Sequence, residues 1–237
     1  MLRNQGNNPL WRTIDWRARQ RAVQNQHPLR GAFGALLGIS ACATVAWVMA
    51  GITFEQVYLI APMGASAVLA FAVPASPLAQ PRSILGGNIV SGLVGLTVAR
   101  LVPWPMPCAA VAVAVAILAM QHLRCIHPPG GAVALVTAMG GHPGAPLPWH
   151  FLLAPVALNS LTLVGAAVLY NNLSGSRYPH RPEVLPEHRL PLPPTYSRAD
   201  LEAVLDEMED QPDIAIDDLD AILRAVETRA RSGGAAS

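Results

Sequence analysis

Long apolar stretches with almost no charge occupy the middle of the chain. Between Gly31 and Ser176 only four residues are acidic or basic: Glu55, Arg82, Arg100 and Arg124. A soluble domain carries charge on about a quarter of its residues, because that charge keeps its surface in water. We therefore expect this region to lie in a lipid bilayer, as part of an integral membrane protein.

Six apolar segments can be distinguished in this region by their length. A helix that crosses the hydrocarbon core needs about 20 mostly apolar residues. Four segments meet or approach that length: Gly31–Ile52, Ile84–Val102, Met106–Leu123 and Phe151–Leu173. Two others, Val57–Val73 and His127–Met139, are interrupted by proline and keep a helical part of only about 12 residues. The pattern predicts an all-α membrane domain with four full helices and two short broken helices.

The two short segments resemble each other in sequence. Residues 61–67 (APMGASA) align with 127–133 (HPPGGAV), and 88–95 (NIVSGLVG) resemble 159–165 (NSLTLVG). Each short segment lies between two full ones, which predicts two three-element repeats over about 31–102 and 106–173. Three crossings per repeat would make the repeats inverted, as in many transporters. The alternative is that small residues align by chance.

The arginines indicate how the segments are oriented. Residues 1–30 hold six arginines against one acidic residue, which predicts a cytoplasmic N-terminus. If all six segments cross, Arg82 and Arg124 fall in cytoplasmic loops and the C-terminus is cytoplasmic as well. If the short segments re-enter instead, both arginines face outward. Six crossings fit better, so we expect a multi-pass protein of the bacterial inner-membrane type.

The C-terminal part differs from the apolar region in composition. Residues 176–196 are rich in proline, which is typical of a semi-rigid linker. Residues 197–237 hold eleven acidic residues against four arginines, and Ser197 followed by Asp200 has the form of a helix N-cap. We therefore predict four regions: a basic segment at 1–29, a membrane domain at 30–175, a linker at 176–196 and an acidic helical tail at 197–237.

The sharpest local motif is the run of residues 126–132 (IHPPGGA). Its two prolines suit a helix start, and its two glycines let a ligand or another helix approach the backbone. Helix N-termini bind anions, and the starts of both short helices would form one site if they met near the bilayer midplane. The alternative is a kink that helps helices pack. Candidate substrate-binding residues are His127, Pro128, Pro129, Gly130, Gly131, Pro62, Gly64, Ser66, Asn88 and Asn159.

His127 is the strongest single candidate, because an ionisable group at membrane depth is costly and usually functional. It could bind an anion or carry a proton, or it could cap a helix. Asn88 and Asn159 occupy matching repeat positions, where they could line a substrate path or join helices. Arg124 could attract an anion, although an interfacial arginine that sets topology is the simpler interpretation.

Several other classes of function are disfavoured by the sequence. Buried acids and a nucleophile with a partner set are lacking, so we do not expect an enzyme. The spacing of His122, Cys125 and His127 matches no common zinc pattern. We therefore expect no metal and no other cofactor. The expected partners are the lipid bilayer and a small inorganic anion, with no nucleic acid.

The HPPGGA motif at 127–132, the block at 62–66 and the Gly87-Asn88 pair together resemble the HPP family of integral membrane proteins. The resemblance covers most of residues 28–175. It implies a small multi-spanning protein, often described with four transmembrane helices, in a family thought to contain transporters. Relatives in photosynthetic organisms have been linked to nitrite transport. Longer relatives continue into paired cystathionine-β-synthase-type domains. We do not expect this sequence to include those domains, so we do not expect regulation by adenine nucleotides either.

Together these observations predict a transporter or channel for a small anion such as nitrite. His127 would bind the substrate or a proton, and the small-residue faces would suit a homo-oligomer. The alternative is a membrane scaffold or sensor that acts through its acidic cytoplasmic tail.

Overall fold

The computed structural model describes residues 28–49, 59–141, 145–180, 195–208 and 214–233, and these hold helices and no strand. The helices are α2 (Pro28–Met49), α3 (Pro62–Ala72), α4 (Pro81–Leu101), α5 (Pro105–His122), α6 (Pro128–Met139), α7 (Asn159–Leu173), α8 (Arg198–Glu207) and α9 (Ile216–Gly233). A 3₁₀ turn, η2 (Pro77–Ala79), precedes α4, and a π-helix, η3 (Leu152–Leu158), leads into α7. The predicted all-α class is confirmed. The expectations for residues 1–27 and 50–58 lie outside the described residues.

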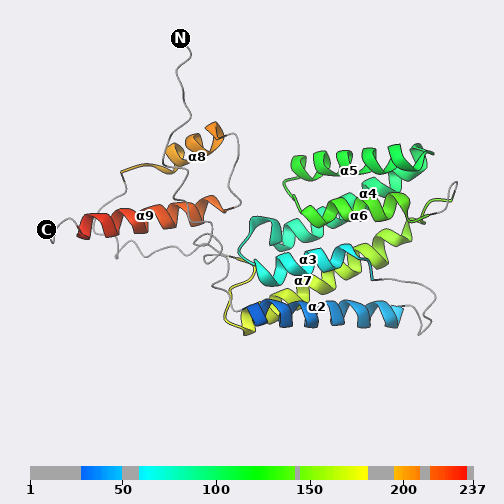
Figure 1. Cartoon of the computed structure of the whole chain (residues 1–237), viewed down its shortest axis with the longest axis horizontal. Coiled ribbons are helices and arrows are strands. Elements are labelled where there is room, and N and C mark those ends of the chain that lie inside the picture. The colour runs from blue at the N-terminus through cyan, green and yellow to red at the C-terminus, as the bar shows by residue number, and fades with distance from the viewer. Residues whose placement is uncertain (1–27, 50–58, 142–144, 181–194, 209–213, 234–237) are drawn as a thin grey trace, which may run out of the picture.

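The alternation of long and short helices is also confirmed. Four helices are long and apolar enough to cross a membrane: α2, α4, α5 and the continuous helix formed by η3 and α7. The two short apolar helices, α3 and α6, each lie between two of these. Successive helices run in opposite directions along the bundle, so the triplet α5–α7 is inverted relative to the triplet α2–α4 (Figure 1).

Proline opens most of the bundle helices. Pro62, Pro81, Pro105 and Pro128 each stand at the start of their helix. Proline suits this place because its φ angle is already helical and the missing N–H would have no partner in the helix. The predicted start of the second full segment at Ile84 is therefore three residues late, since α4 begins at Pro81.

The last spanning segment contains a π-helix that the apolar pattern did not predict. Pro155 lies inside η3 and lacks the N–H that a regular turn would use. The Asn159 side chain donates a 2.8 Å hydrogen bond to the Pro155 carbonyl oxygen. Widened turns of this kind often occur at functional sites, because they change where side chains point.

Close packing of α4 against α6 joins the two triplets. A Cβ atom on Gly95 would lie 2.5 Å from the Ala134 carbonyl oxygen, and one on Gly130 would lie 2.7 Å from the Ser91 hydroxyl. Such contacts leave no room for a methyl group, and small residues are what let helix backbones approach in membranes. Gly130 is thus a packing residue, which is the alternative that the sequence left open.

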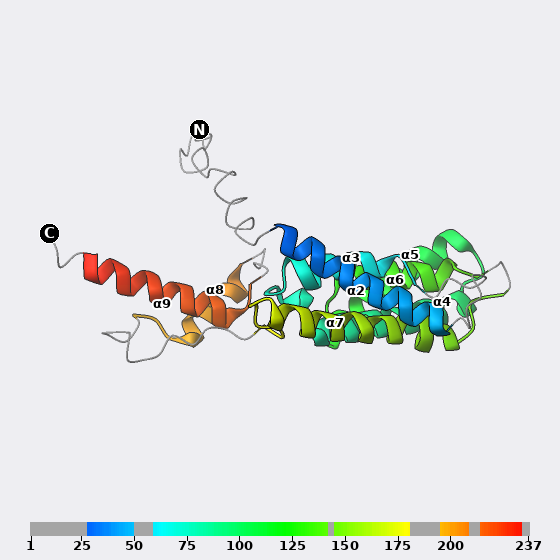
Figure 2. The ribbon, with the colours of Figure 1, turned by 90° about the horizontal axis from the view of Figure 1, so that it is seen from below.

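The two ends of the bundle sequence lie side by side. Arg30 at the start of α2 donates hydrogen bonds to Asn171 and Ser174 at the end of α7, each at 2.9 Å. Tyr178 lies beyond the boundary predicted at residue 175, yet it is buried and donates a 2.7 Å hydrogen bond to the Ala79 carbonyl oxygen. The described chain therefore enters and leaves the bundle at the same end (Figure 2).

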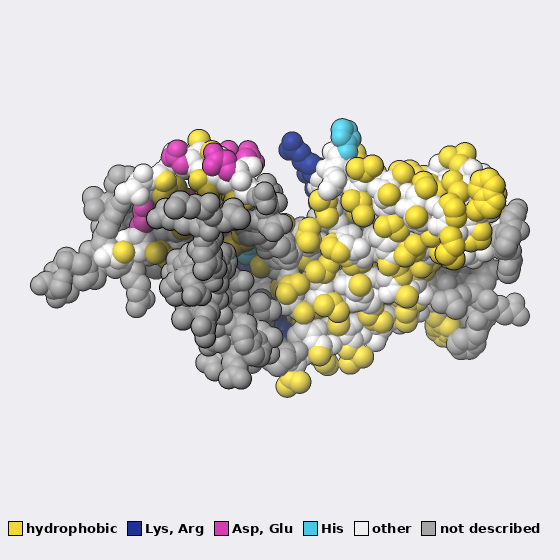
Figure 3. Space-filling model, turned by 45° about the horizontal axis from the view of Figure 1, so that its top comes forward, with side chains coloured by type: hydrophobic (Ala, Val, Ile, Leu, Met, Phe, Trp, Pro, Cys, Tyr) yellow, Lys and Arg dark blue, Asp and Glu magenta, His cyan; other side chains and the backbone are white. Residues whose placement is uncertain are grey.

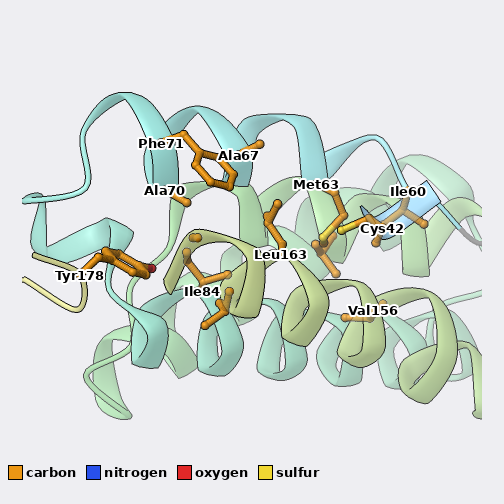
Figure 4. Close-up of a cluster of buried hydrophobic side chains, with 13 residues drawn as sticks. Cys42, Ile60, Met63, Ala67, Ala70, Phe71, Ile84, Val156, Leu163 and Tyr178 are labelled. Carbon is orange, nitrogen blue, oxygen red and sulfur yellow. The ribbon is translucent and has the colours of Figure 1, made fainter. Parts of the chain in front are cut away.

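Apolar side chains fill the centre of the bundle and also cover its outside. The central cluster is built from α2, α3, α4, α6, η3 and α7, and its larger members include Phe71, Met63, Ile84 and Leu163 (Figure 4). Large apolar side chains such as Leu36 and Leu118 are more than half exposed. Figure 3 shows hydrophobic atoms spread over the visible bundle surface. An apolar exterior of this extent suits contact with lipid.

The tail forms the predicted helical pair. Ser197 and Asp200 make a reciprocal capping box at the start of α8, in which each side chain bonds the other residue's backbone N–H. Arg198 of α8 forms an ion pair with Asp217 of α9. Acidic side chains gather on this part of the surface, in contrast to the bundle (Figure 3).

Candidate functional site

His127 lies at the contact between the two short helices. It occupies the N-cap position of α6, and its side chain is fully buried. Its Nε2 atom is 2.8 Å from the Ser66 hydroxyl of α3, and its Nδ1 atom is 2.9 Å from the Leu78 carbonyl oxygen of η2. Two residues from different repeats, both predicted as site residues, are thereby brought together.

These two contacts determine the tautomer of the imidazole ring. A carbonyl oxygen only accepts hydrogen bonds, so Nδ1 must carry the hydrogen that bonds Leu78. In the neutral ring Nε2 then accepts from the Ser66 hydroxyl. Both ring nitrogens are engaged, so a substrate could bind Nε2 only by displacing Ser66.

The starts of the two short helices do not face each other. Ser66 is one turn inside α3 and contacts His127 immediately before α6. The two helices run in opposite directions, so their N-terminal ends point toward opposite ends of the bundle (Figure 1). The single site between two facing helix starts, considered from the sequence, is therefore not formed.

The backbone N–H groups at these starts are largely committed. The prolines lack them, and the N–H groups of Met63, Gly64 and Gly130 bond nearby carbonyl oxygens at 2.8 to 3.0 Å. Most backbone N–H groups that could bind an anion at these helix starts are therefore already bonded to carbonyl oxygens of the protein.

Asn88 and Asn159 behave differently despite their matching repeat positions. Asn88 is fully buried on α4 and donates a 3.0 Å hydrogen bond to the Ser160 hydroxyl of α7. Asn159 donates instead to Pro155 within its own helical segment. Ser160 was not among the predicted residues; its position next to Asn159 is the signal that could have identified it.

The Asn88–Ser160 and Ser66–His127 pairs lie in one polar layer. Met63, one turn before Ser66, has its sulfur 4.0 Å from the Ser160 hydroxyl oxygen. On α4, a Cβ atom on Gly87 would lie only 2.5 Å from the His127 Cβ atom. We call these four polar residues the central polar layer. Its members come from α3, α4, the N-cap of α6 and α7, and so from both triplets.

Five of the other predicted residues do not belong to this layer. Pro62 and Pro129 are buried, whereas Pro128 is exposed. A Cβ atom on Gly64 or Gly131 would meet nothing within 4 Å. At each of these two glycines a side chain would therefore point into open space.

A cavity lies at the far end of the bundle, away from His127. It is open on one side, has a volume of about 300 Å³ and is lined by Arg100, Cys108, Ala138 and Met139 among others. The Arg100 guanidinium donates to the Leu147 carbonyl oxygen at 2.7 Å and stacks over Trp149 at 4.2 Å. These contacts hold the Arg100 side chain at the end of α4, at the edge of the apolar region. Arg124, at the opposite end, is exposed and has a φ of 52°.

Comparison with known proteins agrees with this architecture. The family model of the HPP transmembrane region matches residues 20–179. A transmembrane protein of Dictyostelium discoideum is 40% identical over 134 residues, which are 53% of this chain and 42% of that protein. A second transmembrane protein of the same organism is 36% identical over 130 residues, 51% of this chain and 44% of the relative. The chain thus spans less than half the length of these curated relatives.

No solved structure matches the chain. The family match covers every helix of the bundle, including the short helix that begins at the HPP tripeptide of residues 127–129. Both relatives are described as transmembrane proteins, in agreement with the four spanning helices of this chain. This chain is a multi-pass membrane protein and belongs to the family defined by the HPP transmembrane region.

Proposed function

We propose that this protein moves a small anion, such as nitrite, across its membrane. The observation that carries the proposal is the Ser66–His127 contact, which joins the two short helices of an inverted pair of triplets inside an apolar bundle. In transporters with inverted repeats, broken helices meet near the repeat interface and form the substrate site there. A buried histidine at this depth would be a costly feature without such a role.

The sign of the substrate's charge follows from the charges of the bundle. Its described residues up to His180 hold five arginines and no acidic side chain: Arg30, Arg82, Arg100, Arg124 and Arg177. The excess positive charge raises the local concentration of anions at both ends. The central polar layer holds neutral dipoles instead of fixed charge, so an ion would not be trapped there.

We further propose that both termini are cytoplasmic. Arg82 donates to the Leu123 carbonyl oxygen next to Arg124, and Arg30 bonds the end of α7 near Arg177. Four arginines therefore gather at the end where the chain enters and leaves the bundle, with Arg100 at the other end. An excess of arginine marks the cytoplasmic side. Labelling of cysteines introduced at Ser174 and Pro146 from one side of sealed vesicles would test this orientation.

The transport proposal is tested by uptake of nitrite, nitrate and formate into proteoliposomes. We expect saturable uptake of at least one of them, reduced in His127→Ala and in Ser66→Ala. Thr97→Ala is the matched control, because this exposed hydroxyl on α4 bonds only the Leu93 carbonyl oxygen of its own helix. Absence of any flux above empty liposomes, with folded protein, would contradict the proposal.

The second candidate function, a scaffold or sensor, rests on the tail. Helices α8 and α9 expose Val204, Met208, Ile222 and Val226 beside their acidic residues, which suits a partner surface. Truncation after His180 keeps Tyr178 in the bundle and separates the two functions. The truncated protein should keep its flux if it is a transporter. A scaffold would show no flux with or without the tail, and truncation would release its partner.

A further inference from the structure

The amide of Asn88 has one orientation that its surroundings allow. The Ser160 hydroxyl donates its single hydrogen to the Val156 carbonyl oxygen at 2.7 Å, so toward Asn88 it can only accept. The Asn88 group at 3.0 Å must therefore be the NH₂ group. The other end of the amide, Oδ1, is consequently an acceptor, and this fully buried atom has no hydrogen-bond partner.

The rest of the central polar layer cannot supply the missing donor. The Ser66 hydroxyl is engaged with His127, and the Nδ1 hydrogen of His127 is directed at Leu78. The neighbouring Ser91 hydroxyl contacts the sulfur of Met120 at 3.5 Å. A buried acceptor left in this condition costs free energy, and such an atom in a native structure calls for an explanation.

We infer that Asn88 Oδ1 accepts a hydrogen bond from the transported species, which therefore crosses the centre of the bundle as a neutral, protonated acid. This inference rests on the proposed function and specifies its substrate. A bare anion would be repelled by the partial negative charge of the carbonyl oxygen, whereas an acidic O–H is the donor that this oxygen lacks. The substrate class is a small weak acid, of which nitrous and formic acids are examples.

The charge balance of such a step is simple. On the entry side one anion takes up one proton from water, and the resulting acid binds at Asn88. On the exit side the acid releases the same proton and anion, so no net charge crosses the membrane. A strong acid such as nitric acid stays ionised at working pH and offers no O–H, so nitrate should be excluded.

The test uses the full chain in proteoliposomes with nitrite and nitrate as paired probes, and empty liposomes supply the background. Potassium gradients with valinomycin set the membrane potential. We expect nitrite flux that does not respond to the potential and nitrate flux equal to the background. Flux of nitrate, or nitrite flux that follows the potential, would overturn this inference but would support the proposed anion transport. Absence of flux for nitrite and formate as well would overturn both.

Substitution at Asn88 tests the named atom. Asn88→Leu should lower the nitrite flux about tenfold, the effect of one lost hydrogen bond to the substrate. Asn88→Asp keeps an acceptor oxygen at this position and should retain more flux, and Thr97→Ala should match the wild type. If Asn88→Leu carries nitrite as fast as the wild type, the oxygen holds at most a water molecule and the inference fails. If Asn88→Leu does not fold, the measurements of nitrite flux at different membrane potentials and of nitrate flux on the wild type still test whether the substrate crosses as a neutral acid.

Discussion

Adding one methyl group at Gly87 should disrupt the contact between the two short helices. The Cβ atom of Gly87→Ala would lie 2.5 Å from the His127 Cβ atom and 2.9 Å from the Cys125 carbonyl oxygen. Neither neighbour is the far end of a flexible side chain. His127 is also held on both ring nitrogens, by Ser66 and by Leu78. To make room, α4 must move away from the start of α6, or His127 must leave its partners.

The size of the effect can be worked out from these contacts. Overpacking a filled interior costs about 1–3 kcal/mol. A hydrogen bond broken at His127 adds about 1 kcal/mol. We therefore expect Gly87→Ala to lower the free energy of unfolding by about 2–4 kcal/mol. The matched control is Gly165→Ala in α7, where a Cβ atom meets nothing within 4 Å. That change should stabilise the protein by about 0.5–1 kcal/mol, because alanine favours a helix over glycine.

The assay is unfolding in mixed micelles by increasing SDS, followed by tryptophan fluorescence, for the wild type and both variants. A double-mutant cycle with Ser66→Ala then tests the cause. If the added methyl group displaces His127, Ser66→Ala should cost about 1 kcal/mol in the wild type and almost nothing in Gly87→Ala. Equal stability of Gly87→Ala and Gly165→Ala would refute the close approach of α4 to His127. Additive effects of Gly87→Ala and Ser66→Ala would refute the displacement of His127.

Three further predictions concern the ends of the bundle and the tail. Tyr178→Phe leaves the Ala79 carbonyl oxygen without its donor and should cost about 1–2 kcal/mol in the same unfolding assay. Arg30→Leu removes the bonds to the end of α7 and should increase hydrogen exchange there, with no change in the tail. Ser197→Ala should lower the stability of α8 by about 1 kcal/mol, seen as faster amide exchange in its first turn. Hydrogen bonds from Ser197 lower the pKa of Asp200. The stabilisation by this cap is therefore fully present at pH values above the ordinary pKa of aspartate, and it is lost as the pH falls through the lowered pKa of the folded state.

The helices could be predicted from the sequence because apolar length and proline placement are local signals. The near absence of charge between Gly31 and Ser176 identified the membrane domain, and segment length separated the full helices from the short ones. The capping box of Ser197 and Asp200 predicted the start of α8. The π-helix around Pro155 was missed, because apolar length alone takes no account of a proline inside a spanning segment, where the missing N–H disturbs a regular turn.

The candidate site could be predicted only in part, because its partners come from distant parts of the chain. A histidine in an apolar segment is a strong signal, and the family resemblance pointed to the same residue. That its partner is Ser66, 61 positions earlier, follows only from the packing of α3 against α6. The alignment of the repeats suggested equal roles for Asn88 and Asn159. In the structure Asn159 donates to the Pro155 carbonyl oxygen of its own helical segment, whereas Asn88 donates to the Ser160 hydroxyl of another helix. A repeat alignment compares positions and carries no information about which neighbour a side chain meets.

The Ser66–His127 bond also makes the two halves of the molecule energetically unequal. In the repeat alignment the counterpart of His127 is Ala61, and the counterpart of Ser66 is Ala132. Inverted-repeat carriers change access by letting the halves exchange conformations. After such an exchange two alanines would occupy the places of the bonded pair, and no hydrogen bond could replace it. If the proposed transport proceeds in this way, the conformation described has one hydrogen bond, worth about 1 kcal/mol, that its mirror conformation lacks. The resting protein should then favour one side of the membrane.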